Sequence, residues 1–362
     1  MQLSPQTPVD SLTSVISAHY NRRAQTYDNA TTFHKSLARA YVKYVKPILG
    51  EKALDLACGT GMVGFALNSE NSLSRLHGID ISPGMLEIAR LKTSEAINLE
   101  SKQMAPSLPL EHSRLPIIRF DHHDITYLST LSSLSDSKGE FDIITICSSF
   151  ILLPSPLKNL RSWIPYLKDS SSSPSPIPIE LSSVPPHQTR LHNKFGGRLI
   201  LDIPHPSSML GLSVFSKLSP EFGIPVLGSR NWIGMSELEG MKNLERLMRE
   251  AGLVEVEVFE TDIFPDIPAA TPWGDRTGMN IGGREVKGRR EWPATIEVGE
   301  MIFEVMTVGG NMERWREGGD EGKKRRRERW AEEWVKLGVR YEGEEIVVRE
   351  EGRLIIGIGF KG

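Results

Sequence analysis

Three glycines follow a short apolar run that contains one acid. The run Leu54-Asp55-Leu56-Ala57-Cys58 leads directly into Gly59, Gly61 and Gly64. Glycines at this G-x-G-x-x-G spacing allow a tight turn and let a ligand approach the backbone closely, as they do where nucleoside cofactors bind after the first strand of a βαβ unit. The sequence therefore predicts a nucleoside-cofactor site at this turn.

Asp55 helps to decide between two classes of cofactor. It lies four positions before Gly59, where a dinucleotide pyrophosphate on the helix N-terminus would meet a negative neighbour. A nucleoside that carries an ammonium and a sulfonium would instead be attracted. The acid therefore favours S-adenosylmethionine (SAM) over NAD, and a nicotinamide-dependent dehydrogenase stays as an alternative.

Short apolar runs alternate with helical stretches from residue 53 onward, which predicts a parallel sheet covered by helices on both faces. Seven strands are expected, at residues 53–57, 75–80, 116–120, 141–147, 197–203, 254–260 and 353–360. Capping residues support the helices between them. Ser82, which precedes a proline, predicts an N-cap, and Ser236 with Glu239 forms a capping-box pattern.

The chain is expected to divide into segments with different tasks. We expect a helical cap over the cofactor at residues 1–50, the core at 51–262, a lid or substrate-side insertion at 263–345, and the last strand of the core sheet at 346–362. Two Ser- and Pro-rich stretches of the core, 94–115 and 168–195, have too little apolar surface to order themselves well. They are predicted to be loose insertions.

Composition argues against several classes of protein. The 362 residues carry 43 Lys and Arg against 46 Asp and Glu, a balance unlike that of a chain devoted to wrapping nucleic acid. Cys58 and Cys147 are too few for a disulfide framework. Neither an apolar leader nor a stretch of about 18 uncharged apolar residues occurs. An intracellular, cytoplasmic protein without a membrane span is expected, and nothing in the sequence predicts its oligomeric state.

Four elements, in this order, resemble the class I SAM-dependent methyltransferases. They are the run from Asp55 to Gly61, Asp80 at the end of the second strand, Asp124-Ile125 after the third strand, and the strand from Phe141 to Cys147. The resemblance covers roughly residues 12–262 and the last strand. It implies an α/β fold of the Rossmann-like kind, a doubly wound seven-stranded sheet with an antiparallel last strand, and SAM as the cofactor.

On the methionine and ribose side, the resemblance implies that the glycine loop lies against the methionine part of SAM. Asp55 would reach the ammonium, often through water. Asp80, which lies 21 residues after Gly59, would accept hydrogen bonds from both ribose hydroxyls. Cys147 would line the floor beneath the sulfonium. The loop residues expected at the cofactor are Ala57, Cys58, Gly59 and Gly61.

On the adenine side, Met85 would lie near the ring, and Ile81 is a further residue expected at the cofactor. Asp124 would accept from the adenine amino group, and Ile125 would pack on the ring. Asp121 is an alternative to Asp124, because the run between them offers two acids. No metal site is expected at the two intervening histidines, since adjacent residues on a strand point to opposite faces.

The cap and the fifth strand offer further candidates. Tyr27 and Arg23 resemble residues that meet the methionine carboxylate in such enzymes; alternatively Tyr27 packs and Arg23 stays in water. Methyl transfer mainly needs alignment and exclusion of water, so a base is optional. His205, just past the fifth strand, is the predicted catalytic base, and His34 is the second candidate.

The sequence thus predicts a SAM-dependent methyltransferase that acts on a small organic acceptor. The alternative is a protein that binds SAM without transferring methyl. A nucleic-acid acceptor is not expected, because the fourth strand ends in Ser148-Ser149-Phe150-Ile151 rather than in an Asn/Asp-Pro-Pro-aromatic motif. The basic run 323–329 could be a nuclear address or a phosphate contact, but the acids around it favour the solvated face of a helix.

Overall fold

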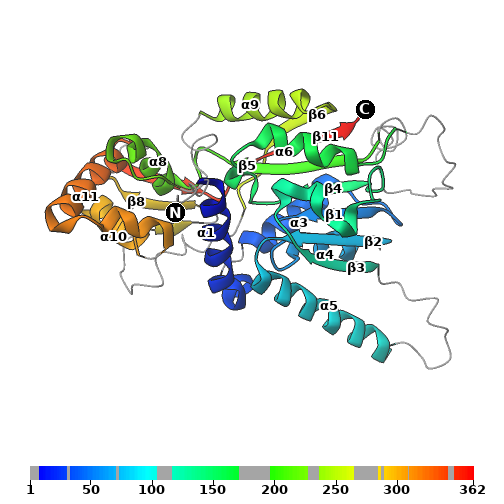
Figure 1. The fold of residues 1–362 in the computed structure, drawn as a ribbon. Helices are drawn as coiled ribbons and strands as arrows, with labels where there is room; N and C mark the ends of the chain where they lie inside the picture. Colours follow the sequence, from blue (N-terminus) through cyan, green and yellow to red (C-terminus); the bar gives the residue numbers. More distant parts are fainter. Residues whose placement is uncertain are drawn as a thin grey trace, which may run out of the picture.

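The structure of the chain is a computed structural model (Figure 1). It describes residues 8–30, 33–70, 73–103, 116–170, 196–226, 236–264, 284–286, 289–308, 310–340 and 346–362. These residues form a core around one large sheet, an N-terminal helical cap, and a second unit that lies beside the core. In Figure 1 the second unit is at the left, the core is at the right, and α1 (Pro8–Arg23) stands between them.

The core sheet has seven strands. In spatial order they are β3 (Ile117–His122), β2 (Arg75–Asp80), β1 (Lys52–Leu56), β4 (Ile143–Ile146), β5 (Arg198–Pro204), β11 (Leu354–Lys361) and β6 (Leu253–Glu260). Strand β11 runs antiparallel to both of its neighbours, and the other pairs are parallel. The predicted seven-stranded, doubly wound sheet with an antiparallel last strand is confirmed. Its order reverses between β1 and β4, the place where open α/β sheets bind ligands.

Helices cover both faces of this sheet, and the alternation of side chains along each strand decides which face they meet. Leu54 and Leu56 of β1 share a buried cluster with α6 (Pro156–Trp163) and α9 (Glu237–Glu250). Ala53 shares a different cluster with α3 (Phe33–Val45) and α4 (Met62–Glu70). The core is therefore a three-layer arrangement. Short 3-10 helices at Ala24–Thr26, Ile125–Thr130, Ser132–Leu134, Phe150–Leu152 and Ile164–Tyr166 join its elements.

The predicted helix starts are present. α5 (Pro83–Gln103) begins at the proline after Ser82, whose hydroxyl accepts a hydrogen bond from the Met85 N–H at 3.3 Å. Ser236 and Glu239 form the capping box at the start of α9. The helix α5 also corrects one prediction: residues 94–103 are helical rather than loose. The rest of that stretch, 104–115, and residues 171–195 lie outside the described residues.

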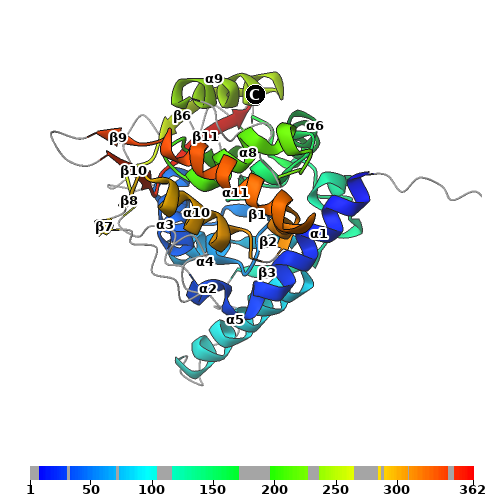
Figure 2. The same cartoon turned by 90° about the vertical axis from the view of Figure 1, so that its left-hand side faces the viewer.

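The second unit has its own sheet and its own core (Figure 2). Its antiparallel sheet has the order β7 (Arg284–Val286), β8 (Arg289–Pro293), β10 (Ile346–Glu351) and β9 (Val339–Arg340). It is completed by a 3-10 helix at Gly310–Arg316 and by α8 (Leu210–Phe222), α10 (Ile296–Met306) and α11 (Gly319–Val335). The rings of Trp330 and Trp334 stack with centroids 5.4 Å apart, beside Phe215 and Trp315.

The predicted C-terminal boundary of the second unit, at residue 345, lies one strand too early. Residues 346–351 form β10, which pairs with β8 in the second sheet, and only β11 joins the core. Helix α8 lies in the segment that was predicted as core, but it belongs to the second unit, because the apolar side of α8 packs against α11 and α10. No helix among the described residues combines the length and apolar character that a bilayer crossing requires.

The basic run 323–329 lies on α11 and faces acids of its own unit. Lys323 and Arg327 pair with Glu304 of α10, and Arg329 pairs with Glu333 and with Glu221 of α8. Lys324 pairs with Glu328, Arg326 donates to the carbonyls of Trp315 and Glu317, and Arg325 lies over the ring of Phe222. The run is therefore a helix face within an ion-pair network, the second of the two interpretations offered by the sequence.

A buried arginine joins α3 to the sheet. The Arg198 side chain is 2% exposed, donates through Nη1 and Nη2 to both carboxylate oxygens of Glu51, and donates through Nε to the carbonyl of Val45 at 2.9 Å. Removing one partner of such a buried pair leaves the other charge without compensation.

We expect Arg198→Met to lower the free energy of unfolding by about 3–5 kcal/mol, measured by urea denaturation. Arg246→Met is the matched control, because it breaks only the exposed pair with Glu250 within α9, a kind of pair worth about 0.3–0.5 kcal/mol. Equal losses in the two variants would contradict a stabilising function of the Arg198 contacts.

Candidate functional site

The turn after β1 has a left-handed backbone at three alternate residues. Ala57 and Gly59 have φ of 54° and Gly61 has φ of 80°. A Cβ added at Gly61 would lie 2.7 Å from the ring of Phe65, so only glycine fits there. A left-handed backbone is energetically unfavourable at a non-glycine residue such as Ala57. It persists mainly where the surrounding structure imposes it, often at functional sites.

Asp55 lies under this turn and is 1% exposed. One carboxylate oxygen accepts from the Thr145 hydroxyl of β4 at 2.7 Å, and the other accepts from the N–H of Gly64 in the first turn of α4 at 3.2 Å. Burial raises the pKa of Asp55 to about 7. The geometry places the carboxylate inside the core, where it ties β1, β4 and α4 together.

Asp80 joins two loops at the ends of neighbouring strands. Its carboxylate accepts from the N–H of Gly59 at 2.8 Å and from the N–H of Ser82 at 2.7 Å. The residue is 8% exposed, and burial raises the pKa of its carboxyl. Each carboxylate oxygen keeps a second lone pair, so these contacts leave the group able to accept from a ligand hydroxyl.

A pocket lies between these loops and the cap helix α1. It brings together four residues predicted for the cofactor, Ala57, Ile81, Asp124 and Ile125. The pocket is also lined by residues that were not predicted at the cofactor from the sequence: Thr13, Ile16, His123, Thr126, Ser149, Leu152, Leu153 and Pro154. The apolar members suit a flat aromatic ring, and Asp124 offers an acceptor for an exocyclic amine. The pocket therefore fits an adenine.

Asp124 and Asp121 have different surroundings. Asp124 lines the pocket, where one oxygen accepts from the Thr126 N–H at 2.9 Å and the other accepts from the Thr13 hydroxyl at 3.3 Å. Burial would raise the pKa of Asp121, but the hydrogen bond from the Ser133 hydroxyl and the pairs with Arg119 and His77 outweigh it and hold the pKa of this carboxyl below the usual range. Of the two predicted acids, Asp124 is the one in the pocket. Among the described residues no cluster of three or more His, Cys, Asp or Glu could hold a metal.

The cap contacts the cofactor loops through polar side chains. The Ser17 hydroxyl donates to the Ile81 carbonyl at 3.0 Å, and the side-chain oxygen Oδ1 of Asn21 accepts from the Gly84 N–H at 2.9 Å. In α2 (Tyr27–Ala30), Asp28 accepts from the Thr60 hydroxyl at 2.6 Å. These contacts join the cap to the Ile81 loop, to the start of α5 and to the glycine loop.

Tyr27 lies in this cap and contacts His34 of α3. Its hydroxyl is 3.1 Å from His34 Nε2, and the two rings stack with centroids 5.0 Å apart. The Arg23 guanidinium lies 5.5 Å from the centre of the Tyr27 ring. Burial, with help from Arg23, lowers the pKa of His34 to about 4. The structure thus brings Tyr27 together with the two cap residues, Arg23 and His34, that the sequence considered.

Other predicted residues lie outside the pocket wall. Cys58 is 9% exposed and packs with Phe120, and Met85 is 1% exposed. Cys147 is half-buried, and burial raises the pKa of its thiol. His205 Nδ1 accepts from the Ser207 N–H at 3.1 Å, while Nε2 lies 3.4 Å from a Glu260 oxygen. The Nε2–Glu260 contact is an ion pair only when the imidazole is protonated.

The sequence analysis missed a second buried acid. Asp202 on β5 accepts from the Tyr41 hydroxyl at 2.5 Å and from the Ser148 N–H at 2.9 Å. Burial raises its pKa to about 6. Asp202 has the same sequence pattern as Asp55: it is an acid within an apolar strand that leads to a ligand-binding edge of the sheet. This pattern could have identified Asp202. Asp202 fixes the backbone that follows β4, where Ser148 has φ of 52°.

The chain was compared with known proteins. The profile of the methyltransferase-domain family matches residues 54–170. Aklanonic acid methyltransferase DauC of Streptomyces sp. (strain C5) is 35% identical over 82 residues, which are 22% of this chain and 37% of that protein. The ubiquinone/menaquinone biosynthesis C-methyltransferase UbiE of Campylobacter jejuni (strain RM1221) is 33% identical over 118 residues, 28% of this chain and 48% of that protein.

The chain spans less than half the length of these curated relatives. Among solved structures, the YcgJ protein of Bacillus subtilis aligns over 91% of this chain and 98% of its own, with a TM-score of 0.44 and 14% identity. The segment that the family profile matches includes the strands and loops that carry Asp55, Asp80 and Asp124.

The buried state of Asp55 predicts a pH dependence of stability. Its pKa is about 7 in the folded chain and roughly 3.9 when unfolded. At pH values between these two pKa values, Asp55 is protonated in the folded chain and ionised in the unfolded chain. The folded state therefore binds more protons, and the free energy of unfolding falls as pH rises through this window. We expect Asp55→Asn to remove this contribution, so that the stability of wild type relative to the variant decreases from pH 4.5 to pH 7.5.

Urea denaturation of both proteins at several pH values measures this difference. Asp202 has a pKa raised in the same direction, but it is present in both proteins and cancels. Asp136→Asn, at an exposed position, is the control. Stability curves of wild type and Asp55→Asn that stay parallel over the window would show that Asp55 is ionised in the folded chain.

Proposed function

We propose that this chain, whose residues 54–170 match the methyltransferase-domain family, is a class I SAM-dependent methyltransferase that transfers a methyl group from SAM to a small organic acceptor. SAM is the cofactor of this family of domains. One observation carries the proposal: loops from separate strands bring Ala57, Ile81, Asp124 and Ile125 to one pocket beneath α1. The names of the relatives agree with it, since DauC and UbiE are both methyltransferases.

The residues present fit the cofactor. The pocket walls would hold the adenine, with Asp124 toward its amino group, and Asp80 would accept from the ribose hydroxyls at the adjacent strand end. SAM supplies an electrophilic methyl group when bound, so the chain itself has mainly to bind, align and exclude water. Asp55, which is bonded to Gly64 and Thr145, would act on the cofactor through the shape of the loop.

The cap and the second unit favour a small acceptor. α1 and α2 cover the cofactor loops, and the basic run 323–329 is paired with acids of its own unit. His205 would meet an acceptor only by exchanging one of its partners, Ser207 or Glu260. A cytoplasmic setting is part of the proposal, and the two free thiols, Cys58 and Cys147, agree with a reducing compartment.

Asp80→Ala is expected to weaken the binding of S-adenosylhomocysteine at least tenfold, because hydrogen bonds to charged groups are worth roughly 1.5–3 kcal/mol. Calorimetric titration of the purified chain measures this affinity. Asp136→Ala, an exposed aspartate, should bind as wild type does. Unchanged affinity in Asp80→Ala would contradict the assignment of the ribose contact.

The same titration with NAD tests the dehydrogenase alternative, which requires saturation by NAD and none by S-adenosylhomocysteine. Methyl transfer itself is tested with labelled SAM and a panel of small acceptors. Binding of S-adenosylhomocysteine with no methylated product from any acceptor or cell extract would favour the alternative of a SAM-binding protein without transfer.

A further inference from the structure

The cap forms one side of the pocket. We infer that Thr13 and Ile16 of α1 are the pocket wall beside the adenine amino group, and that this wall makes the chain reject a cofactor with a substituent on the amino nitrogen. The inference rests on the proposed function. It adds two residues that determine which nucleoside the pocket accepts, and both come from the cap.

Asp124 has one hydrogen-bonding position left for a ligand. Its Oδ1 accepts from the Thr126 N–H at 2.9 Å and from the Thr126 hydroxyl at 2.7 Å, and its Oδ2 accepts from the Thr13 hydroxyl at 3.3 Å. Each oxygen of a carboxylate has two lone pairs. Among the contacts of the described residues, the vacant position is therefore on Oδ2. An adenine amino group would donate to the same oxygen that Thr13 contacts.

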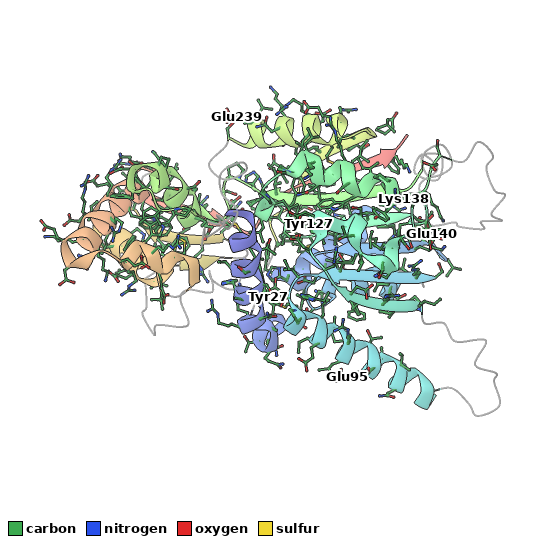
Figure 3. The ribbon with its side chains drawn as sticks, viewed as in Figure 1. Tyr27, Glu95, Tyr127, Lys138, Glu140 and Glu239 are labelled. Carbon is green, nitrogen blue, oxygen red and sulfur yellow. The ribbon has the colours of Figure 1, made fainter. Side chains whose placement is uncertain are left out.

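This position brings the amino nitrogen close to α1. An N–H···O hydrogen bond joins heavy atoms about 2.9 Å apart, so the nitrogen would lie at most about 6 Å from the Thr13 hydroxyl oxygen. Ile16 lies on the same face of α1 and also lines the pocket. Figure 3 shows Tyr127, which belongs to the loop that carries Asp124, on the side of the core that faces α1. A benzyl group on the amino nitrogen would not fit between this loop and α1 without moving the helix.

Asp124 is held in place on the core side of the pocket. Its bonds from Thr126 make it the N-cap of the 3-10 helix Ile125–Thr130. The carbonyl of Ile125 accepts from Nε1 of Trp163 at 2.8 Å, and Trp163 is fully buried in α6. The acid therefore cannot turn away from α1 without breaking its bonds from Thr126.

Helix α1 is held in place on the opposite side. The Ser17 hydroxyl donates to the carbonyl of Ile81, and Oδ1 of Asn21 accepts from the Gly84 N–H. A Cβ added at Gly84 would lie 3.2 Å from Asn21 Oδ1 and 3.3 Å from the Cβ of Ala24, so α1 packs closely on the start of α5. Because both sides are held, the space beside the amino nitrogen has a fixed width, which selects a ligand by its size.

Calorimetric titration of the full chain with S-adenosylhomocysteine and with its N6-benzyl derivative tests the wall. We expect wild type to bind the benzyl derivative at least about tenfold more weakly, because a group forced into a filled site displaces its neighbours. The double variant Thr13→Ala/Ile16→Ala opens the wall. The ratio of its two Kd values should fall to within about threefold, since the benzyl group then has space.

Two single variants are the matched controls. Thr13→Val keeps the volume of the side chain and removes only the hydroxyl, so it should discriminate between the two ligands as wild type does. Val15→Ala truncates an apolar side chain of the same helix that is 42% exposed and lies outside the pocket wall. It should also leave the ratio of the Kd values unchanged.

Discrimination by wild type that is lost only in the double variant supports the inference. Equal binding of both ligands by wild type would overturn it, and this outcome needs no variant. Discrimination that persists in the double variant, or that is also lost in either control, would overturn it as well. Failure of wild type to bind S-adenosylhomocysteine would contradict the proposed function, and this inference with it.

A second measurement follows α1 itself. Hydrogen exchange of the α1 amides reports local opening of the helix. In wild type at saturating ligand, exchange should be faster with the benzyl derivative than with S-adenosylhomocysteine, because the benzyl group displaces the helix. In the double variant the two ligands should protect α1 equally. Equal protection in wild type would show that the benzyl group fits without moving α1, which contradicts the inference.

Discussion

Two buried carboxylates hold the turn on which the site is built. Asp55 fixes one end of the turn by accepting from Gly64 of α4, and Asp80 fixes the middle by accepting from Gly59. These contacts give the turn's N–H groups partners, which offsets the cost of left-handed backbone at Ala57. These contacts also require two acids to be buried. Burial disfavours the charged carboxylates and therefore raises the pKa values of both groups.

The cap is placed by the same loops. Thr13 contacts Asp124, Ser17 contacts the carbonyl of Ile81, and Asp28 contacts Thr60. Helix α1 also supplies part of the pocket wall through Thr13 and Ile16.

The second unit is tied to the core at one corner. Glu350 of β10 accepts from the Leu210 N–H at the start of α8, and the Glu351 N–H donates to the Ser207 carbonyl. His205 and its partner Glu260 lie at this corner. The unit packs its own core of tryptophans around Phe215 and Phe303, so it presents a folded surface beside the cap rather than an extended loop.

The sequence alone determined the core sheet, because apolar strands alternate with capped helices and Asp55, Asp80 and Asp124 stand at strand ends whose positions follow from that alternation. It could not determine which residues of the cap reach these ends. Thr13 and Ile16 come from a helix whose spacing reveals a face but not its partner. Likewise β10 and α8 joined the second unit because side-chain packing between distant segments decides strand and helix partners, and local sequence does not encode that packing.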